Sequence, residues 1–115
     1  MWVKRYASHF LLLPEYGFLK QCVVEIEQEG DVLRIFPLWE ELETVEWHPG
    51  VILLSEKEED KNRITQLFQI RYRLLSDIPA AFQTNISIRQ FVYLLYPFDF
   101  KRMVITGVTA IRRLE

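Results

Sequence analysis

Leu19-Lys20-Gln21-Cys22-Val23-Val24-Glu25-Ile26-Glu27 is the stretch that decides the fold, because its apolar and polar side chains alternate. Cys22, Val24 and Ile26 fall on one face, and the polar residues between them, Glu25 among them, fall on the other. This alternation is typical of a β-strand with one face on the core and one face in solvent. We therefore predict a strand over residues 19–27 with its carboxylates exposed.

The segments on both sides extend this strand into a three-stranded meander. Gly30 lies in a predicted hairpin turn over residues 28–31, and a third strand follows over residues 32–36. Before the central strand, residues 3–13 are predicted to form a first strand, and the Pro-Glu-Tyr-Gly run at residues 14–17 to form the turn after it.

Further strands are predicted in the rest of the chain. Two short ones cover residues 45–47 and 51–54, and longer ones cover residues 88–96 and 101–114. Gly107 marks a bulge or a close backbone approach in the last strand. We expect the first and last strands of the chain to pair with each other.

A helix is predicted over residues 55–76. Ser55 and Glu58 have the spacing of a capping box, and Pro79 disfavours helical geometry in the residue before it. The apolar residues of this segment follow helical spacing: Ile64, Leu67, Phe68, Leu74, Leu75 and Ile78. The expected fold is therefore a single α+β domain over residues 1–115. It has a mostly antiparallel, sandwich-like sheet of about six strands, and one amphipathic helix covers a face of that sheet.

The composition limits the classes of function. The 115 residues are 50% hydrophobic with a formal net charge of −2, which fits a globular protein and excludes a disordered one. The basic clusters are too small to predict nucleic-acid binding, and no apolar run is long enough to span a bilayer. The single cysteine, Cys22, excludes an internal disulfide and a cysteine-based zinc site. A buried Cys22 and a cytoplasmic location are expected.

Four stretches of the first half together resemble a known family. They are Tyr6-Ala7-Ser8-His9-Phe10, residues 17–26, residues 30–36 and Glu46-Trp47-His48-Pro49-Gly50-Val51-Ile52. Their rhythm of strand, glycine and strand resembles the N-terminal strands of amidohydrolase-superfamily enzymes of the cytosine-deaminase-like and chlorohydrolase-like kinds. The resemblance implies a small β-sandwich beside a catalytic barrel, with residues 97–114 as its closing strand.

The chain departs from that family where the chemistry would begin. No His-x-His metal pair follows Val51-Ile52, and a barrel of roughly 200 residues would be missing. No family catalytic residue can be carried over to this sequence. The resemblance therefore implies the sandwich without the enzyme; the alternative is a small α+β domain that converged on the same turn chemistry.

The sequence assembles no catalytic, metal or cofactor site. His9 and His48 are the two histidines, whereas a hydrolytic zinc site usually takes three protein ligands. His9 lies in an apolar strand and is expected to be half-buried, and His48 lies in a Pro-Gly turn and is expected to be exposed. Both remain candidates for lining a pocket.

Aromatic side chains outside the clearest strands are candidates for an interface, because Tyr and Trp are favoured as anchors there. The candidates are Trp39, Trp47, Tyr96 and Phe98. The leading hypothesis is a non-catalytic protein-interaction or scaffold module that forms a homodimer or binds a larger protein. The alternatives are a small-molecule-binding module with an apolar pocket, and an unrecognised small enzyme that uses the histidines or the glutamates.

Overall fold

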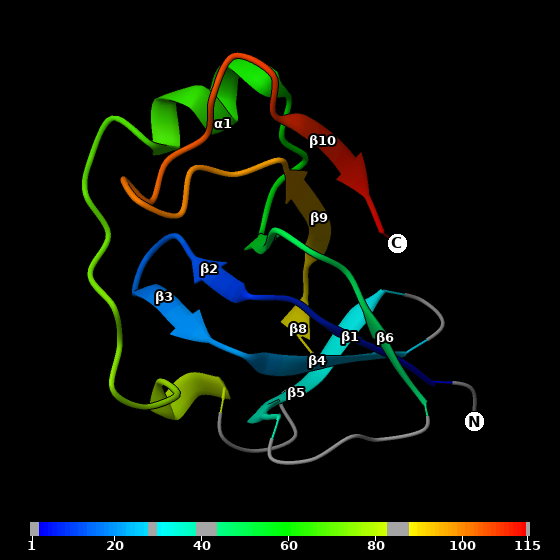
Figure 1. Ribbon diagram of the computed structural model, residues 1–115. Helices are drawn as coiled ribbons and strands as arrows, with labels where there is room; N and C mark the ends of the chain where they lie inside the picture. Colours follow the sequence, from blue (N-terminus) through cyan, green and yellow to red (C-terminus); the bar gives the residue numbers. More distant parts are fainter. Residues whose placement is uncertain (1–2, 28–29, 39–43, 83–87, 115) are drawn as a thin grey trace.

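The structure is a computed structural model, and it describes residues 3–27, 30–38, 44–82 and 88–114. Strands dominate this part of the chain and form two mixed sheets of five strands each (Figure 1). The first sheet has the order β6 (Val45–Trp47), β1 (Val3–Ala7), β4 (Cys22–Glu27), β5 (Asp31–Pro37) and β8 (Ile88–Arg89). The second has the order β10 (Ala110–Arg113), β9 (Phe91–Tyr96), β7 (Val51–Ser55), β2 (Phe10–Leu13) and β3 (Gly17–Lys20).

Helical structure is short in the described residues. It consists of α1 (Lys61–Leu67) and the 3₁₀ turn η1 (Ala80–Phe82). The predicted α+β class is confirmed, whereas the predicted sandwich is not, and the described strands number ten instead of about six. No helix in this part of the chain is long and apolar enough to cross a membrane.

The number of strands differs because three predicted strands, over 3–13, 19–27 and 88–96, break where they pass from one sheet to the other. The predicted strand over 3–13 divides into β1 and β2, and the predicted strand over 19–27 divides at Gln21, which has a φ of 50°. The predicted strand over 88–96 divides into β8 and β9, and β6 and β7, which were predicted as two strands, also lie in different sheets. β8 pairs with β5 in the first sheet, and β9, which follows β8 in the chain, pairs with β7 in the second. Because β1 likewise continues into β2, the strands β1, β4, β5, β8, β9, β7 and β2 form a closed circuit of pairings and chain connections.

Two segments far apart in sequence run side by side through both sheets. β1 pairs in parallel with β6, and β2 pairs in parallel with β7, while the other described pairs are antiparallel. Between these pairs, the Ser8 hydroxyl donates to the Gly50 carbonyl over 2.6 Å, and the His48 amide donates to the Ala7 carbonyl over 2.9 Å. We call this junction, residues 7–9 and 47–50, the seam.

The core has two parts. The inner cluster takes residues from both sheets, such as Val24 and Ile35 from the first and Ile52 and Leu94 from the second. The outer cluster lies on the other face of the second sheet, where Ile64 of α1 is fully buried with Leu53 and Phe98. A helix therefore covers one face of a sheet, as predicted.

The helix is much shorter than the predicted range of 55–76. Asp60, and not Ser55, is its N-cap, and its side chain accepts from the Arg63 amide over 2.9 Å. The Ser55 hydroxyl instead holds a turn, because it accepts from the Lys57 amide and donates to the Glu59 carboxylate.

Beyond α1, tertiary hydrogen bonds replace the predicted helical ones. The Phe18 amide donates to the Arg73 carbonyl over 2.9 Å, and the Leu75 amide donates to the Phe18 carbonyl over 2.8 Å. Gly17 allows this approach, since a Cβ there would lie 2.5 Å from the Arg73 oxygen. Leu74, predicted to face the core, is 60% exposed. The apolar spacing after α1 therefore does not mark a helical face.

The predicted strand over 101–114 was wrong except at its end, where β10 forms. Asp99 accepts from the Lys101 and Arg102 amides, and such side-chain bonds to the backbone compete with a strand ladder. A Cβ on Gly107 would meet nothing within 4 Å, so the predicted close approach is absent there.

The first and last strands also do not pair with each other. β1 pairs with β4 and β6, whereas β10 pairs with β9. The two ends meet through a side chain instead, because the Tyr6 hydroxyl donates to the Leu114 carbonyl over 3.0 Å.

Glu25 was predicted to face solvent, but it is only 7% exposed. Its carboxylate accepts from Arg5 Nε on β1 over 2.8 Å and from Arg34 Nε on β5 over 3.2 Å. Burial alone would raise the pKa of Glu25, but the hydrogen bonds and charges of Arg34 and Arg5 outweigh it and hold this pKa below its ordinary value. Glu25 is therefore the centre of an ion-paired cluster with Arg5 and Arg34.

Candidate functional site

The four predicted interface aromatics have different surroundings. Trp47 and Tyr96 are 43% and 49% exposed, so both are available to a partner. Phe98 is 7% exposed and packs in the outer cluster, so it supports the core instead of a free surface. Trp39 lies outside the described residues.

His9 was predicted to be half-buried, but it is exposed at the seam. Its Nδ1 accepts from the Gly50 amide over 3.2 Å, which fixes the ring against the neighbouring segment. The ring lies edge-on to Trp47, with centroids 5.2 Å apart, and to Phe100, with centroids 5.1 Å apart. Sequence periodicity could not find this arrangement, because the three residues come from three separate segments.

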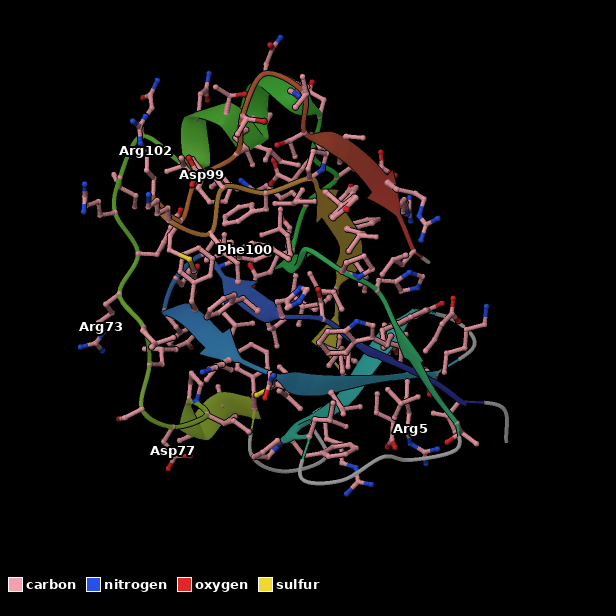
Figure 2. The ribbon with its side chains drawn as sticks, in the orientation of Figure 1. Arg5, Arg73, Asp77, Asp99, Phe100 and Arg102 are labelled. Carbon is pink, nitrogen blue, oxygen red and sulfur yellow. The ribbon has the colours of Figure 1, made fainter. Side chains whose placement is uncertain are left out.

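We call His9, Trp47 and Phe100 the aromatic surface. Phe100 is 39% exposed and packs on Phe10 of β2 and on Phe98, at centroid distances of 5.9 and 5.3 Å. Figure 2 shows Phe100 turned back toward β2, while Arg102 of the same loop projects outward. The aromatic surface is therefore anchored on the outer cluster and does not depend on freely rotating side chains.

Two basic residues follow Phe100 in the sequence, Lys101 and Arg102, and both are exposed. Neither Lys101 nor Arg102 forms an ion pair with any described residue. Glu46 precedes Trp47 on β6, but its side chain projects to the opposite side of the strand and contacts His48. The charged residues that adjoin Phe100 in the sequence are therefore basic.

His48 was predicted to be exposed, but its side chain is only 16% exposed. Its Nε2 lies 3.0 Å from a Glu46 carboxylate oxygen, and its Nδ1 lies 3.1 Å from Arg112 Nη2. Because a guanidinium can only donate, Nδ1 is the acceptor and Nε2 carries the proton that Glu46 accepts. Both ring nitrogens are therefore engaged in holding β6 beside β10.

The remaining candidates for chemistry are held apart in the described residues. No three of their histidines, cysteines and acidic residues gather to hold a metal ion. Cys22 is 4% exposed, as predicted for a small buried apolar residue, and burial raises the pKa of its thiol to about 11. A thiol with such a pKa is not a ready nucleophile at neutral pH.

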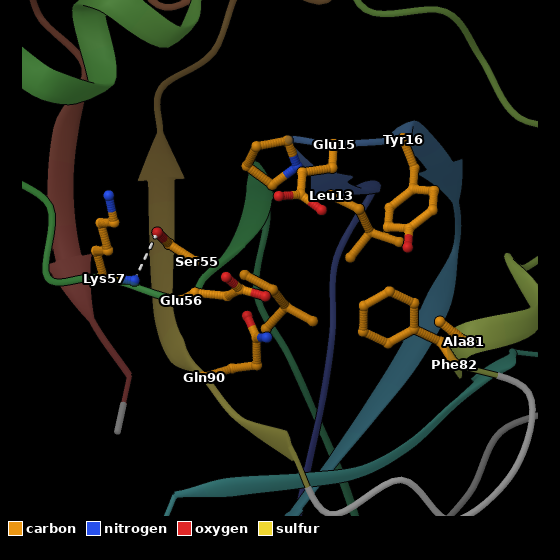
Figure 3. A pocket seen from close by; sticks show the side chains of 11 residues that line it. Leu13, Glu15, Tyr16, Ser55, Glu56, Lys57, Ala81, Phe82 and Gln90 are labelled. Atoms are coloured by element: carbon orange, nitrogen blue, oxygen red, sulfur yellow. Dashed lines mark hydrogen bonds between the residues drawn. The ribbon is translucent and has the colours of Figure 1, made fainter.

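Sequence reasoning missed a pocket of about 210 Å³ next to the β2–β3 turn (Figure 3). Neither histidine lines it. Four segments converge there: the turn after Leu13, the end of β7, η1, and the residue between β8 and β9. The lining residues are Leu13, Pro14, Glu15, Tyr16, Leu54, Ser55, Glu56, Lys57, Ala81, Phe82 and Gln90. No local motif marks such a site, since each segment contributes only one to four residues.

The comparisons with known proteins leave the family open. Searches against protein-family models, curated proteins and solved structures gave no match. The amidohydrolase resemblance of residues 6–52 therefore stays a prediction from the sequence.

Proposed function

We propose that this protein is a non-catalytic interaction module that binds a second copy of itself through the aromatic surface. The observation that carries the proposal is the exposed set of His9, Trp47 and Phe100 rings, held in place by the Gly50 amide and by the outer cluster. Rigid, partly exposed aromatic side chains are the residues that most often dominate binding energy at interfaces.

The choice of a second copy as the partner rests on symmetry and on the edge of the first sheet. A twofold axis through the aromatic surface would let the same patch serve both copies, as an isologous interface requires. β6, which carries Trp47, is also the outer strand of the first sheet, and such edges are covered or paired with another chain.

Sedimentation velocity over a range of protein concentrations tests this proposal. We expect a species of twice the 13.8 kDa chain mass to appear as concentration rises. Trp47→Ala should weaken self-association by about thirtyfold, the effect of losing roughly 2 kcal/mol at an interface anchor. Ile70→Ala is the matched control, because Ile70 is 61% exposed and lies outside the aromatic surface.

A protein that stays monomeric at every concentration, or a dimer that Trp47→Ala leaves unchanged, would refute the proposal.

A further inference from the structure

The base of the pocket beside the β2–β3 turn is lined by apolar side chains. Leu13 and Leu54 are each 2% exposed, and the Phe82 ring lies edge-on to Tyr16 with centroids 5.8 Å apart. Its volume of about 210 Å³ is below the roughly 300 to 1,000 Å³ of sites for drug-sized ligands. The occupant that fits is therefore a small molecule with one short apolar body.

The polar rim of this pocket is acidic. Figure 3 shows the carboxylates of Glu15 and Glu56 directed toward the centre of the pocket from two different segments, whereas the Lys57 ammonium points away from them. The Ser55 hydroxyl is occupied, since it accepts from the Lys57 amide over 3.2 Å and donates to Glu59 over 2.9 Å. The two carboxylates therefore set the charge that a ligand would meet.

Gln90 gives an independent sign that the pocket takes a ligand. Its side chain belongs to a residue that is 94% buried, being 6% exposed, and Figure 3 shows its amide directed into the pocket. This amide has no hydrogen-bond partner among the residues that the structure describes. Among the described residues, every side-chain nitrogen or oxygen that is sealed from solvent has a hydrogen-bond partner. The Gln90 amide atoms have none, so they must be accessible from the pocket. A polar group of a ligand in the pocket would therefore find a hydrogen-bond partner in the Gln90 amide.

We propose that this pocket binds a small organic cation, with an ammonium group attached to a short apolar body. The Glu15 and Glu56 carboxylates and the Gln90 carbonyl oxygen accept its N–H groups, because charge-assisted hydrogen bonds of this kind are the strong ones. The Tyr16 and Phe82 rings contact the apolar body and add an attraction between the cation and their π-faces. This site is separate from the aromatic surface and shares no residue with it.

Titration of the intact protein with three probes of nearly equal shape tests this proposal. Benzylammonium, benzyl alcohol and phenylacetate differ at one polar group, which is cationic, neutral and anionic respectively. We expect saturable amide shifts in ¹H–¹⁵N spectra with benzylammonium, largest at the pocket residues, and at least tenfold weaker binding of the other two, about the effect of one charge-assisted hydrogen bond. Equal affinity for all three probes, or no saturable shift with benzylammonium, would overturn the proposal.

Variants of the lining residues complete the test. Glu56→Gln should weaken benzylammonium binding about two- to fivefold, as an exposed ion pair does, and Glu15→Gln/Glu56→Gln should weaken it further. Gln90→Leu should weaken binding about tenfold.

The matched control is Glu58→Gln, because Glu58 is an exposed carboxylate that contacts Arg113 and does not line the pocket. It should leave the affinity unchanged. The double glutamate variant changes only exposed side chains and should keep the fold, so unchanged affinity in that variant would also overturn the proposal.

Discussion

Gly50 allows a sharp test of the seam, because two distances decide the outcome of its replacement by alanine. Its φ is +118°, a conformation that L side chains rarely adopt, and a Cβ there would lie 2.4 Å from the Leu95 carbonyl oxygen and 3.1 Å from Tyr96 Cβ. The first distance is shorter than real Cβ contacts allow, and backbone atoms cannot turn aside as a side chain can. Gly50→Ala must therefore either move β7 away from β9 or change the φ of residue 50.

The expected cost of Gly50→Ala has two parts. An unfavourable positive φ costs about 1–3 kcal/mol, and forcing a methyl group into packed structure costs about 1–3 kcal/mol more. We therefore expect a loss of about 3–5 kcal/mol in the free energy of unfolding, which corresponds to a fall in Tm of about 10–20 °C for a domain of this size. The hydrogen bonds of Gly50 to His9 and Ser8 should loosen as well.

Urea and thermal unfolding followed by circular dichroism measure this loss. Gly107→Ala is the matched control, since a Cβ on Gly107 meets nothing within 4 Å. That variant should be neutral, or stabilised by up to about 1 kcal/mol through the unfolded chain. If Gly50→Ala unfolds within about 0.5 kcal/mol of the parent protein, or if the two variants lose equal stability, the described geometry of the seam is wrong.

Three further predictions concern the buried groups. Because the pKa of Glu25 is lowered in the folded protein, its stabilising contribution is present above its ordinary pKa of 4.5 and is lost as pH falls through the lowered value; in Glu25→Gln, unfolding curves recorded on acidification should lose this part of their pH dependence. Cys22, with its pKa raised to about 11, should react with a thiol reagent far more slowly in the folded protein than in denaturant, and equal rates would contradict its burial. Phe98→Ala should cost about 3–5 kcal/mol of stability as a core truncation, whereas Trp47→Ala should cost less than about 1 kcal/mol; a reversed order in urea unfolding would show that the core and surface assignments are exchanged.

Local patterns predicted the strands well where alternation and turn residues agree. Residues 22–27 of the predicted strand over 19–27 form β4, and the predicted strand over 32–36 appears as β5 with nearly the predicted bounds. The same alternation could not show that the chain turns at Gln21 and enters the other sheet, because the apolar residues nearest the break, Leu19 and Cys22, are both buried. A continuous strand and a strand that breaks between two sheets can therefore have the same sequence pattern of alternating apolar residues.

The predicted helix shows the opposite limit, where a strong local pattern was overruled. Within the predicted range only Lys61–Leu67 is helical, and the backbone near Leu74 pairs with Phe18, more than fifty residues earlier in the chain. Hydrogen bonds of that kind depend on tertiary placement, which apolar spacing does not encode. The exposure of His9 and the partial burial of the His48 side chain were misjudged for the same reason, since both depend on residues far away in the sequence, Gly50 for His9 and Arg112 for His48.

The candidate sites were also beyond local patterns. Trp47 could be named from its residue type, but its contact with His9 requires the parallel pairing of residues 3–13 with residues 45–55. The pocket around Gln90 joins four segments, so no window of the sequence contains it.

The closed circuit of strand pairings also orders events during synthesis. Residues 3–55 contain both members of each parallel pair, so those pairs can form as soon as this part of the chain has left the ribosome. The inner cluster, however, is closed only when β8 and β9 join β5 and β7. Until residue 96 has emerged, β5 and β7 each have one unpaired edge beside apolar side chains. During this interval the nascent chain has the greatest need for chaperones that protect it from aggregation.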